Sequence, residues 1–331
     1  MSRHDDLRPH GLFIGLATLD LIQRVDALPG PDTKATATWQ QLAAGGPALN
    51  AAVTFAALGG HATLLTRIGA GPVASLVTDD LQRHDVDVVD LAAADYALAV
   101  SAIAVERTGA RQVVSTDAGR TTPPEPGALD ARGAFGKANP DIVVLDGHHA
   151  DLARAMLDRL DRLDRLDRLD RLDRLDPDTG PPVVLDAGRW KPAMAELVPR
   201  CTHVICSADF RLDGELDGEL GGELDGDALL VALLARGARL AASTHGPDPI
   251  RWRTASERGE VAVASTEAVD TLGAGDALHG AYAWAVATGA QTPDDLRFAA
   301  NVATLSTTRR GTRAWLADLP DLARPANRRT R

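Results

Sequence analysis

Short apolar segments alternate along the chain with longer segments whose apolar residues recur at helical spacing. The short runs cover residues 11–16, 62–69, 141–147, 182–188, 202–207 and 238–244, and most of them end in Gly, Asp or Ser. Continuous apolar runs of this kind are typical of parallel strands buried on both faces. Helices are predicted between them, for example over 47–58, 226–237 and 276–290. The alternation predicts an α/β layered fold that binds ligands at the carboxyl ends of its strands.

Two segments near the N-terminus interrupt this alternation. Residues 17–45 and 96–118 have the pattern of irregular strands and hairpins with glycine turns. We expect them to form a small β appendage inserted in a single domain that spans residues 1–331.

Two low-complexity segments also stand out, a Leu-Asp-Arg repeat over 157–176 and an acidic run over 212–227. A three-residue period rotates the leucines around an α-helix, so the repeat predicts a solvated helix without a fixed core face. The repeat is either a protruding interaction arm or a tolerated insertion, and we favour the insertion. The acidic run is interpreted in the same way, because its acids lack the ligand spacing of calcium-binding loops.

The net charge of −11 does not indicate a nucleic-acid partner. The acidic run alone holds seven acids and no base, so the rest of the chain carries a net charge of only −4. No apolar run approaches the length of a membrane span, and the N-terminus lacks the apolar core of a signal peptide, so we expect a cytoplasmic protein. Cys201 and Cys206 lie five residues apart, which predicts opposite faces of a strand and two reduced, buried thiols.

The stretch VDTLGAGDALHGA, residues 269–281, places an acid where a glycine-rich turn meets a helix. The backbone N–H groups of Gly273, Ala274 and Gly275 at a helix N-terminus predict an anion hole. An acid beside such a hole would not bind phosphate. Asp276 is therefore either a base that takes a proton from a hydroxyl during phosphoryl transfer or a simple helix cap.

A second polar cluster is predicted near the N-terminus. Gly45 and Gly46 turn into a helix that carries Asn50, and Asp20 follows the first strand. Short polar groups beside a glycine-rich backbone can bind vicinal hydroxyls, since each hydroxyl donates and accepts. The alternative is that Asn50 only starts a helix and Asp20 only stabilises a turn.

These two elements, in this order, resemble the signatures of the ribokinase-like (PfkB-type) carbohydrate kinases over nearly the whole chain outside the two low-complexity segments. The resemblance implies a Rossmann-type layered fold with a mostly parallel central sheet, helices on both faces and a β lid built from the two irregular segments. It also implies an ATP-dependent sugar kinase with Asp276 as its general base, and it allows a homodimer through the lid. Mg²⁺ is implied as a cofactor, and K⁺ is a further candidate.

The resemblance assigns further site residues, each with a structural role as the open alternative. Thr244 and Gly246 match the nucleotide loop, Asn301 a residue near adenine, and Asp270 and Thr271 a monovalent-cation site. Asp186 and Lys191 are expected at a strand end that faces the cleft. His148 or His149 is expected beside the substrate, because both follow a strand. His279, three residues after Asp276, either senses substrate or packs under the site.

The sequence departs from the family at two points. The Asn-x-x-Glu motif that organises Mg²⁺ should fall near residues 205–210, where Ser207 and Phe210 occupy the polar positions; Asp209 could substitute through water. Pro47 stands where ribokinase-type members carry lysine. Other motifs look closer to the ketohexokinase-like subgroup, which includes kinases of fructose derivatives and of sulfofructose.

The substrate and activity leave alternatives. We expect a small polar sugar, uncharged or singly anionic, with a ketose favoured. A nucleoside kinase of the same family would need an aromatic or apolar slot for the base, and only 4% of the residues are aromatic. A catalytically weak sugar-binding or regulatory protein is the third candidate. A Rossmann dehydrogenase is disfavoured, because no G-x-G-x-x-G follows the first strand.

Overall fold

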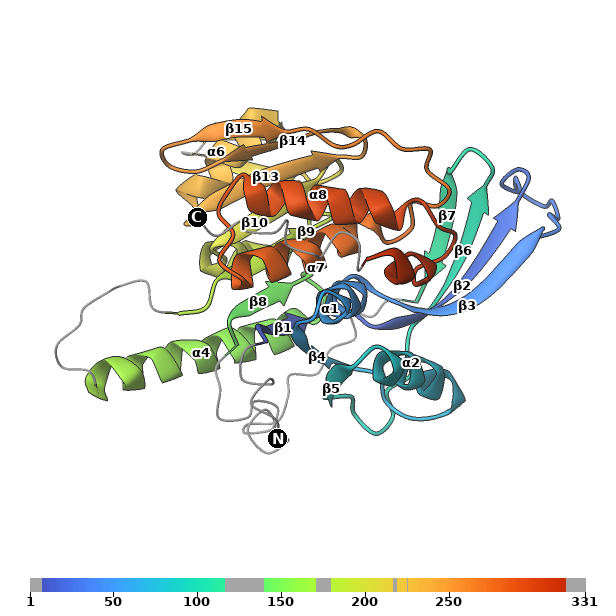
Figure 1. Ribbon diagram of the computed structural model, residues 1–331, viewed down its shortest axis with the longest axis horizontal. Helices are drawn as coiled ribbons and strands as arrows, with labels where there is room; N and C mark the ends of the chain where they lie inside the picture. Colours follow the sequence, from blue (N-terminus) through green and yellow to red (C-terminus); the bar gives the residue numbers. More distant parts are fainter. Residues whose placement is uncertain (1–7, 117–139, 171–179, 217–218, 225, 320–331) are drawn as a thin grey trace, which may run out of the picture.

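A nine-stranded sheet forms the centre of the computed structural model, which describes residues 8–116, 140–170, 180–216, 219–224 and 226–319 (Figure 1). Its strands lie in the order β15-β14-β13-β10-β9-β8-β1-β4-β5. In chain order they are β1 (His10–Ile14), β4 (His61–Thr66), β5 (Val86–Asp90), β8 (Ile142–Leu145), β9 (Val183–Ala187), β10 (His203–Ser207), β13 (Leu240–His245), β14 (Asp248–Arg253) and β15 (Arg258–Val261).

The predicted parallel sheet is confirmed. Every pairing from β5 to β13 is parallel, and only β14 and β15 add to the edge in antiparallel fashion. The middle strands are buried along their length, as in Ile142–Leu145 and Val183–Ala187. Burial on both faces explains why these segments are continuous apolar runs without alternation.

Helices cover both faces of the sheet. One hydrophobic cluster contains apolar residues of α1 (Pro47–Ala57), α2 (Pro72–Arg83), α7 (Ala274–Ala287) and α8 (Asp294–Ser306). The cluster on the other face contains those of α4 (Ala150–Asp170), α5 (Met194–Leu197) and α6 (Gly226–Ala235). Two 3₁₀ turns, Val198–Arg200 and Ala314–Asp318, complete the helical elements of the described chain.

A second, four-stranded sheet stands to one side of the main layers (Figure 1). It has the order β3-β2-β6-β7, from β2 (Thr18–Val25), β3 (Trp39–Gly45), β6 (Val100–Glu106) and β7 (Arg111–Ser115). The two irregular segments of the sequence therefore pair with each other through β2 and β6, as expected for a lid. Residues 117 and 118, the last two of the second segment, lie outside the described residues. On its inner face, Ile22, Ile103 and Val105 pack with Leu272 of the main domain.

The chain reverses its direction of sheet growth at β1. After β1 the chain adds β4 and β5 on one side, and it later adds β8, β9, β10 and β13 on the other. Such a switch point opens a crevice at the carboxyl ends of the neighbouring strands. Asp146, directly after β8, accepts hydrogen bonds from the backbone N–H groups of Leu16 (2.8 Å), Ala48 (3.1 Å) and His148 (2.8 Å). Its carboxylate thus joins the ends of β1 and β8 to the start of α1.

The two low-complexity segments have more structure than the sequence predicted. The repeat continues α4, whose first turns are packed: Leu157 is buried and Leu160 is partly buried against the core. Asp158 and Asp161 pair with Arg200 at 2.7 and 2.8 Å. A fixed face therefore exists at the start of the repeat, while residues 171–176 lie outside the described residues.

The acidic run, interpreted above as a tolerated insertion, forms a hairpin. Its strands are β11 (Leu212–Leu216) and β12 (Glu219–Leu224), which pair in antiparallel fashion, and its last two residues begin α6. Leu212 is buried and Leu224 is partly buried against the core. These two leucines anchor the ends of the hairpin, and residues 217, 218 and 225 lie outside the described residues.

Both cysteines are free and buried, as predicted, but the face assignment was wrong. Cys201 precedes β10, and it packs in the same cluster as Cys206. Burial raises the pKa of the Cys206 thiol and raises that of Cys201 to about 12, so both stay protonated. Among the described helices, none has the length and apolarity needed to cross a bilayer.

Candidate active site

The glycine-rich turn before α7 leaves a helix N-terminus without a side-chain cap. Gly273 occupies the N-cap position in the left-handed region (φ 79°, ψ 6°), which favours glycine. A Cβ built on Gly275 would meet no atom within 4 Å, so the backbone is open to a ligand there. Within the described chain, the N–H groups of Gly275 and Asp276 have no hydrogen-bond partner. The turn has the donors that an anion hole requires.

Asp276 lies in the first turn of α7, and its carboxylate does not cap the helix. Burial raises the pKa of Asp276 to about 6, and the nearby carboxylates of Asp186 and Asp146 add to the effect. Asn50 and His279 act in the opposite direction. A carboxylate with a pKa of about 6 is a better proton acceptor than an ordinary aspartate and is still mostly ionised at neutral pH.

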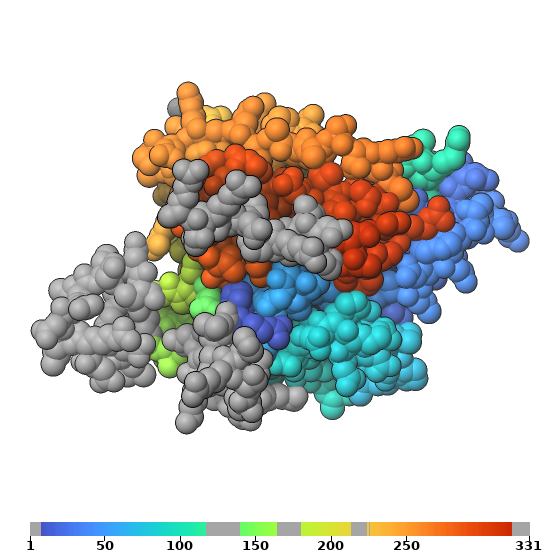
Figure 2. All heavy atoms as spheres, in the orientation of Figure 1, coloured from blue at the N-terminus to red at the C-terminus, as the bar shows by residue number. Residues whose placement is uncertain are grey.

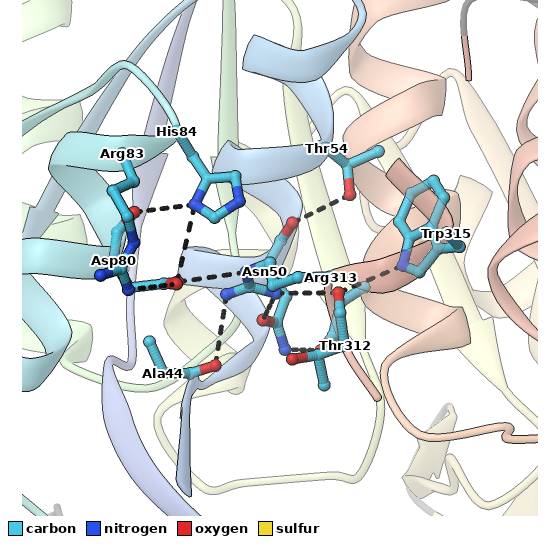
Figure 3. Close-up of polar contacts among 10 residues, drawn as sticks. Ala44, Asn50, Thr54, Asp80, Arg83, His84, Thr312, Arg313 and Trp315 are labelled. Atoms are coloured by element: carbon cyan, nitrogen blue, oxygen red, sulfur yellow. Dashed lines mark hydrogen bonds and ion pairs between the residues drawn. The ribbon is translucent and has the colours of Figure 1, made fainter. Parts of the chain in front are cut away.

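Asn50 connects this acid to the rest of the site. Its Nδ2 donates to Oδ2 of Asp276 at 2.7 Å. Its Oδ1 accepts from Nη1 of Arg313 at 2.9 Å, and Figure 3 shows these two residues together. Since arginine can only donate, the amide oxygen of Asn50 must face Arg313 and its NH₂ must face Asp276. The alternative in which Asn50 only starts a helix is therefore insufficient.

Arg313 is a site residue that the sequence analysis missed. It donates through Nε to Oδ2 of Asp80 at 3.1 Å and through Nη2 to the carbonyl oxygen of Ala44 at 3.2 Å. Figure 3 shows Arg313 between Asp80 of α2 and Asn50 of α1. In Figure 2 the red C-terminal segment lies directly against the cyan α2 and the blue lid strands. Asp80 thus holds Arg313, and Arg313 orients Asn50.

Asp20 lies on the lid strand β2, buried against the turn into α1. Oδ1 of Asp20 accepts a hydrogen bond from Thr18 at 2.8 Å. A Cβ on Gly45 would lie 2.0 Å from Oδ2 of Asp20, so only glycine fits beside this carboxylate. Gly46 (φ 102°) must also be glycine, because a Cβ there would approach the carbonyl oxygen of Leu16 to 2.2 Å.

Asp20 is close enough to Asp276 for the two charges to interact. Burial raises the pKa of Asp20, hydrogen bonds from Thr18 and Ser101 lower it, and the charge of Asp276 raises it further. The turn alternative for Asp20 is wrong, because the residue is within a strand paired on both sides.

The two histidines after β8 have different surroundings. His148 is half-buried, and its backbone N–H donates to Asp146. His149 is buried, with Nδ1 3.2 Å from Nη1 of Arg67, and burial lowers its pKa to about 4. His149 is thus a neutral core residue, so His148 remains the candidate for substrate contact.

Asp186 and Lys191 lie at the end of β9, close to the acid of α7. Oδ2 of Asp186 is 3.3 Å from Nδ1 of His279, and Lys191 donates to the carbonyl oxygen of Asp146 at 3.2 Å. Burial raises the pKa of Asp186, while the charges of His279 and Lys191 lower it. His279 also contacts the carbonyl oxygen of Gly275 at 2.8 Å, so it packs under the glycine-rich turn.

The expected nucleotide residues are spread over three elements. Thr244, on β13, donates to the carbonyl oxygen of Cys206 at 3.2 Å. Gly246 forms the exposed β13–β14 turn (φ 62°) with no atom near its Cβ position. Asn301 is exposed on α8. Thr244 thus lies on β13, the strand next to β10, and Gly246 lies in the turn that follows the carboxyl end of β13.

A Mg²⁺ ion finds few protein ligands. No group of three or more His, Cys, Asp or Glu in the described residues could hold a metal. Asp209 is exposed and lies 3.7 Å from Arg189. Mg²⁺ usually binds through one or two carboxylates together with substrate phosphates. Asp186 is the last residue but one of β9, and Asp209 follows the adjacent parallel strand β10, so both are near the same edge of the sheet.

The monovalent-cation site expected at Asp270 and Thr271 does not fit a cation. Asp270 is buried and forms an ion pair with Arg24 of the lid, Nη2 to Oδ2 at 2.8 Å. Its carboxylate also accepts from the N–H groups of Leu272 (3.2 Å) and Gly311 (3.0 Å). The side chain of Asp270 is thus neutralised by the protein itself, and Thr271 is exposed.

The described chain combines a doubly wound sheet with a lid, an uncapped glycine-rich helix start and an acid oriented by Asn50. Comparison with known proteins agrees, since a model of the "pfkB family carbohydrate kinase" matches residues 11–318. The chain therefore belongs to the pfkB family of carbohydrate kinases. The predicted family and class of enzyme, a sugar kinase, are confirmed; the ketohexokinase-like subgroup stays a prediction.

Solved structures of the same fold support this assignment. The chain is similar to a putative ribokinase from Agrobacterium tumefaciens, with 26% identity, TM-score 0.73 and coverage of 96% of this chain and 98% of that one. It also resembles ribokinase from Arabidopsis thaliana complexed with ribose and ATP (18%, TM-score 0.68, coverage 96% and 99%). A third is ribokinase from Cryptococcus neoformans var. grubii serotype A in complex with ADP (18%, TM-score 0.67, coverage 95% and 99%).

Proposed function

We propose that the protein transfers the γ-phosphate of ATP to a hydroxyl of a small sugar, with Asp276 as the general base. The observation that carries this proposal is the position of the Asp276 carboxylate, which Asn50 holds beside an uncapped, glycine-rich helix start. The raised pKa of Asp276 supports the same role. The two complexes named above, one with ribose and ATP and one with ADP, support ATP as the donor.

The chemistry follows from the positions of these groups. A sugar hydroxyl is too weak an acid to ionise in advance, so its proton must leave as its oxygen forms the new bond to phosphorus. Asp276 accepts that proton, and the bond from phosphorus to the leaving oxygen of ADP breaks. The N–H groups of Gly275 and Asp276 and the dipole of α7 stabilise the negative charge on the transferred phosphoryl group. The N–H of Ala274, also expected in the anion hole, donates to the carbonyl oxygen of Thr271 at 3.3 Å.

Asp20, Gly45, Gly46 and Asn50 support a sugar site beneath the lid. The Asp20 carboxylate is buried directly over Gly45, and the charge of Asp276 raises its pKa. An ionised carboxylate accepts hydrogen bonds from hydroxyls, which favours a polyol over an apolar ligand. We assign a ketose or ketose derivative as the substrate, on the resemblance of the motifs and this polar lining, with His148 as an additional contact.

Thr244, Gly246, Asp186, Lys191 and Asn301 are proposed to bind the nucleotide. Lys191 is a cation at the end of β9, where its charge also lowers the pKa of Asp186. Mg²⁺ would be held by the phosphates together with Asp186 and Asp209. When bound, the ion neutralises phosphate charge and polarises the transferred group.

A homodimer through the lid is proposed from the outer face of that sheet. Leu42, Leu21, Ala102 and Val114 lie opposite one another in one row across its four strands. Leu42 is 55% exposed and Val114 is 73% exposed. The buried residues Ile22 and Ile103 occupy the other face. An exposed apolar row of this kind marks an interaction surface, and a second copy of the lid is its simplest complement.

A substrate screen tests the proposed function. Purified protein is incubated with ATP and Mg²⁺, and ADP release is measured with ketoses, aldoses, sugar acids and nucleosides, with Asp276→Asn as the background control. We expect the fastest turnover with a ketose. A nucleoside phosphorylated far faster than any sugar would make the protein a nucleoside kinase. Sugar binding without turnover of any substrate would identify a regulatory sugar-binding protein.

A further inference from the structure

One ion pair connects the lid directly to the loop that precedes the anion hole. Nη2 of Arg24 lies 2.8 Å from Oδ2 of Asp270, and the two side chains are only 15% and 5% exposed. Asp270 is three residues before Gly273. Its carboxylate also accepts hydrogen bonds from the backbone N–H groups of Leu272, in the same loop, and of Gly311, in the segment after α8.

Strand β2 of the lid places Arg24 in this position, because the side chains of a strand alternate between its two faces. Asp20, Ile22 and Arg24 share one face of β2, because successive side chains of a strand point to opposite sides. Ile22 is fully buried in the lid cluster with Ile103 and Leu272. The packing that brings Asp20 to the sugar site therefore also brings Arg24 to Asp270.

The surroundings of Asp270 oppose the binding of a free cation. A cavity of about 120 Å³ lies here between the lid and residues 268–272. Among the described residues that line it are Arg24, Arg107 and Arg111, and the acid among them is Asp270. A K⁺ ion bound to this carboxylate would lie beside the Arg24 guanidinium, whose Nη2 is 2.8 Å from Oδ2 of Asp270. Two positive charges on the same carboxylate repel each other strongly in a partly buried site.

We propose that Arg24 supplies the positive charge that a monovalent cation would otherwise supply to the loop 270–275. Arg24 is then a positioning residue that acts through Asp270 on the anion hole, and nucleotide binding is independent of K⁺. This inference rests on the proposed function only in that the loop binds phosphate.

The test compares the effects of two monovalent cations on the full-length protein in the absence of sugar. Melting temperature and affinity for ADP are measured by calorimetry in potassium chloride and in tetramethylammonium chloride at the same ionic strength. The variants are Arg24→Ala and Arg24→Lys. Arg107→Ala and Arg111→Ala are matched controls, because they remove exposed arginines from the same cavity.

We expect the wild-type values to be equal in both salts, within about twofold for the affinity. Arg24→Ala should lose about tenfold or more in ADP affinity and melt several degrees lower, since it leaves a buried acid unpaired. Potassium or guanidinium chloride should restore part of both losses in that variant, while the controls stay near wild type.

Three results would overturn the proposal. One is wild-type protein that binds ADP much more tightly in potassium than in tetramethylammonium. The second is an Arg24→Ala variant with unchanged ADP affinity, and the third is an equal loss in both control variants. If Arg24→Ala fails to fold, the wild-type comparison and Arg24→Lys still decide. Failure to find a phosphorylated sugar would contradict the proposed function but would leave this comparison intact.

Discussion

The side-chain amide of Asn50 donates a hydrogen bond of 2.7 Å to the carboxylate of Asp276, across 226 residues of sequence. The bond stabilises the ionised form of the acid against burial and the charges of Asp186 and Asp146. The pKa of about 6 is the balance of these opposing effects, so the bond predicts how activity depends on pH.

Removal of the Asn50 amide should move the pH profile. A base must be deprotonated, so we expect wild-type kcat/KM to fall with an acid limb near pH 6. Asn50→Ala loses a bond to the charged form, which raises the pKa of Asp276 and shifts the limb to higher pH. Thr54→Val on the same helix, which loses only a bond to the Asn50 carbonyl oxygen, is the control. An unchanged limb in Asn50→Ala would show that another group titrates.

Arg313 should act on catalysis through Asn50. Arg313→Met frees the Asn50 amide to rotate, and we expect kcat to fall about tenfold or more while KM changes less. The melting temperature should also fall, because Asp80 loses its buried partner. Arg309→Met, at an exposed ion pair with Asp318, is the matched control.

A double variant separates the two roles of Arg313. Asp80→Asn with Arg313→Met removes the unpaired charge and should recover much of the melting temperature without recovering kcat. Recovery of both together would mean that Arg313 is only structural.

The sequence predicted the layers of the fold because each central strand is a short, fully buried apolar run. It also indicated the lid, since residues 17–45 and 96–118 break that pattern. The pairing of β2 with β6 could not be predicted, because no local signal specifies which distant strand is the neighbour. The acidic hairpin was missed because its glycines and acids are depleted in strands.

Site residues that belong to a short sequence motif were predicted. Site residues that stand alone in the sequence were missed. Asp276 and Asn50 each belong to a glycine-containing signature. Arg313 bonds to Asn50 across 263 residues, and nothing in the sequence distinguishes it from the neighbouring arginines. Arg24 was missed because no sequence motif indicates its tertiary contact with Asp270. The cation expected at Asp270 followed from resemblance alone, and the tertiary contact with Arg24 changes that site.

The Leu-Asp-Arg repeat should be dispensable beyond its packed start. Leu157 and Leu160 contact the core, and Asp161 pairs with Arg200. A variant that shortens the repeat should therefore retain Leu160 and Asp161. Deletion within 163–174 should keep activity within a few-fold, measured as kcat. Leu157→Asp, in contrast, should destabilise the fold by placing a charge in the core. Loss of folding or of an oligomer on the deletion would contradict this expectation.

The outer face of the lid should hold two copies of the chain together. We expect light scattering at micromolar concentration to give twice the chain mass, and Leu42→Glu with Val114→Glu to reduce it to the monomer mass. Val73→Glu, which charges an exposed valine on α2, should leave the mass unchanged. A wild-type monomer, or a dimer that survives both lid substitutions, would contradict the proposed interface.

The central claim, that Asp276 is the proton acceptor, is tested most directly by kcat and melting temperature of Asp276→Asn. Removal of such a base costs about 10² to 10⁴ in rate. The pKa of Asp276 is higher in the folded protein than in the unfolded chain, so proton binding by this acid stabilises the fold at low pH. This contribution to the free energy of unfolding is lost as the pH rises toward about 6. At pH 7 the neutral amide therefore removes a partly buried charge that lies near the carboxylates of Asp186 and Asp146. We predict a collapse of kcat with ADP affinity unchanged and a melting temperature equal to or above that of the wild type. A variant that melts early and still turns over near the wild-type rate would show that Asp276 is structural.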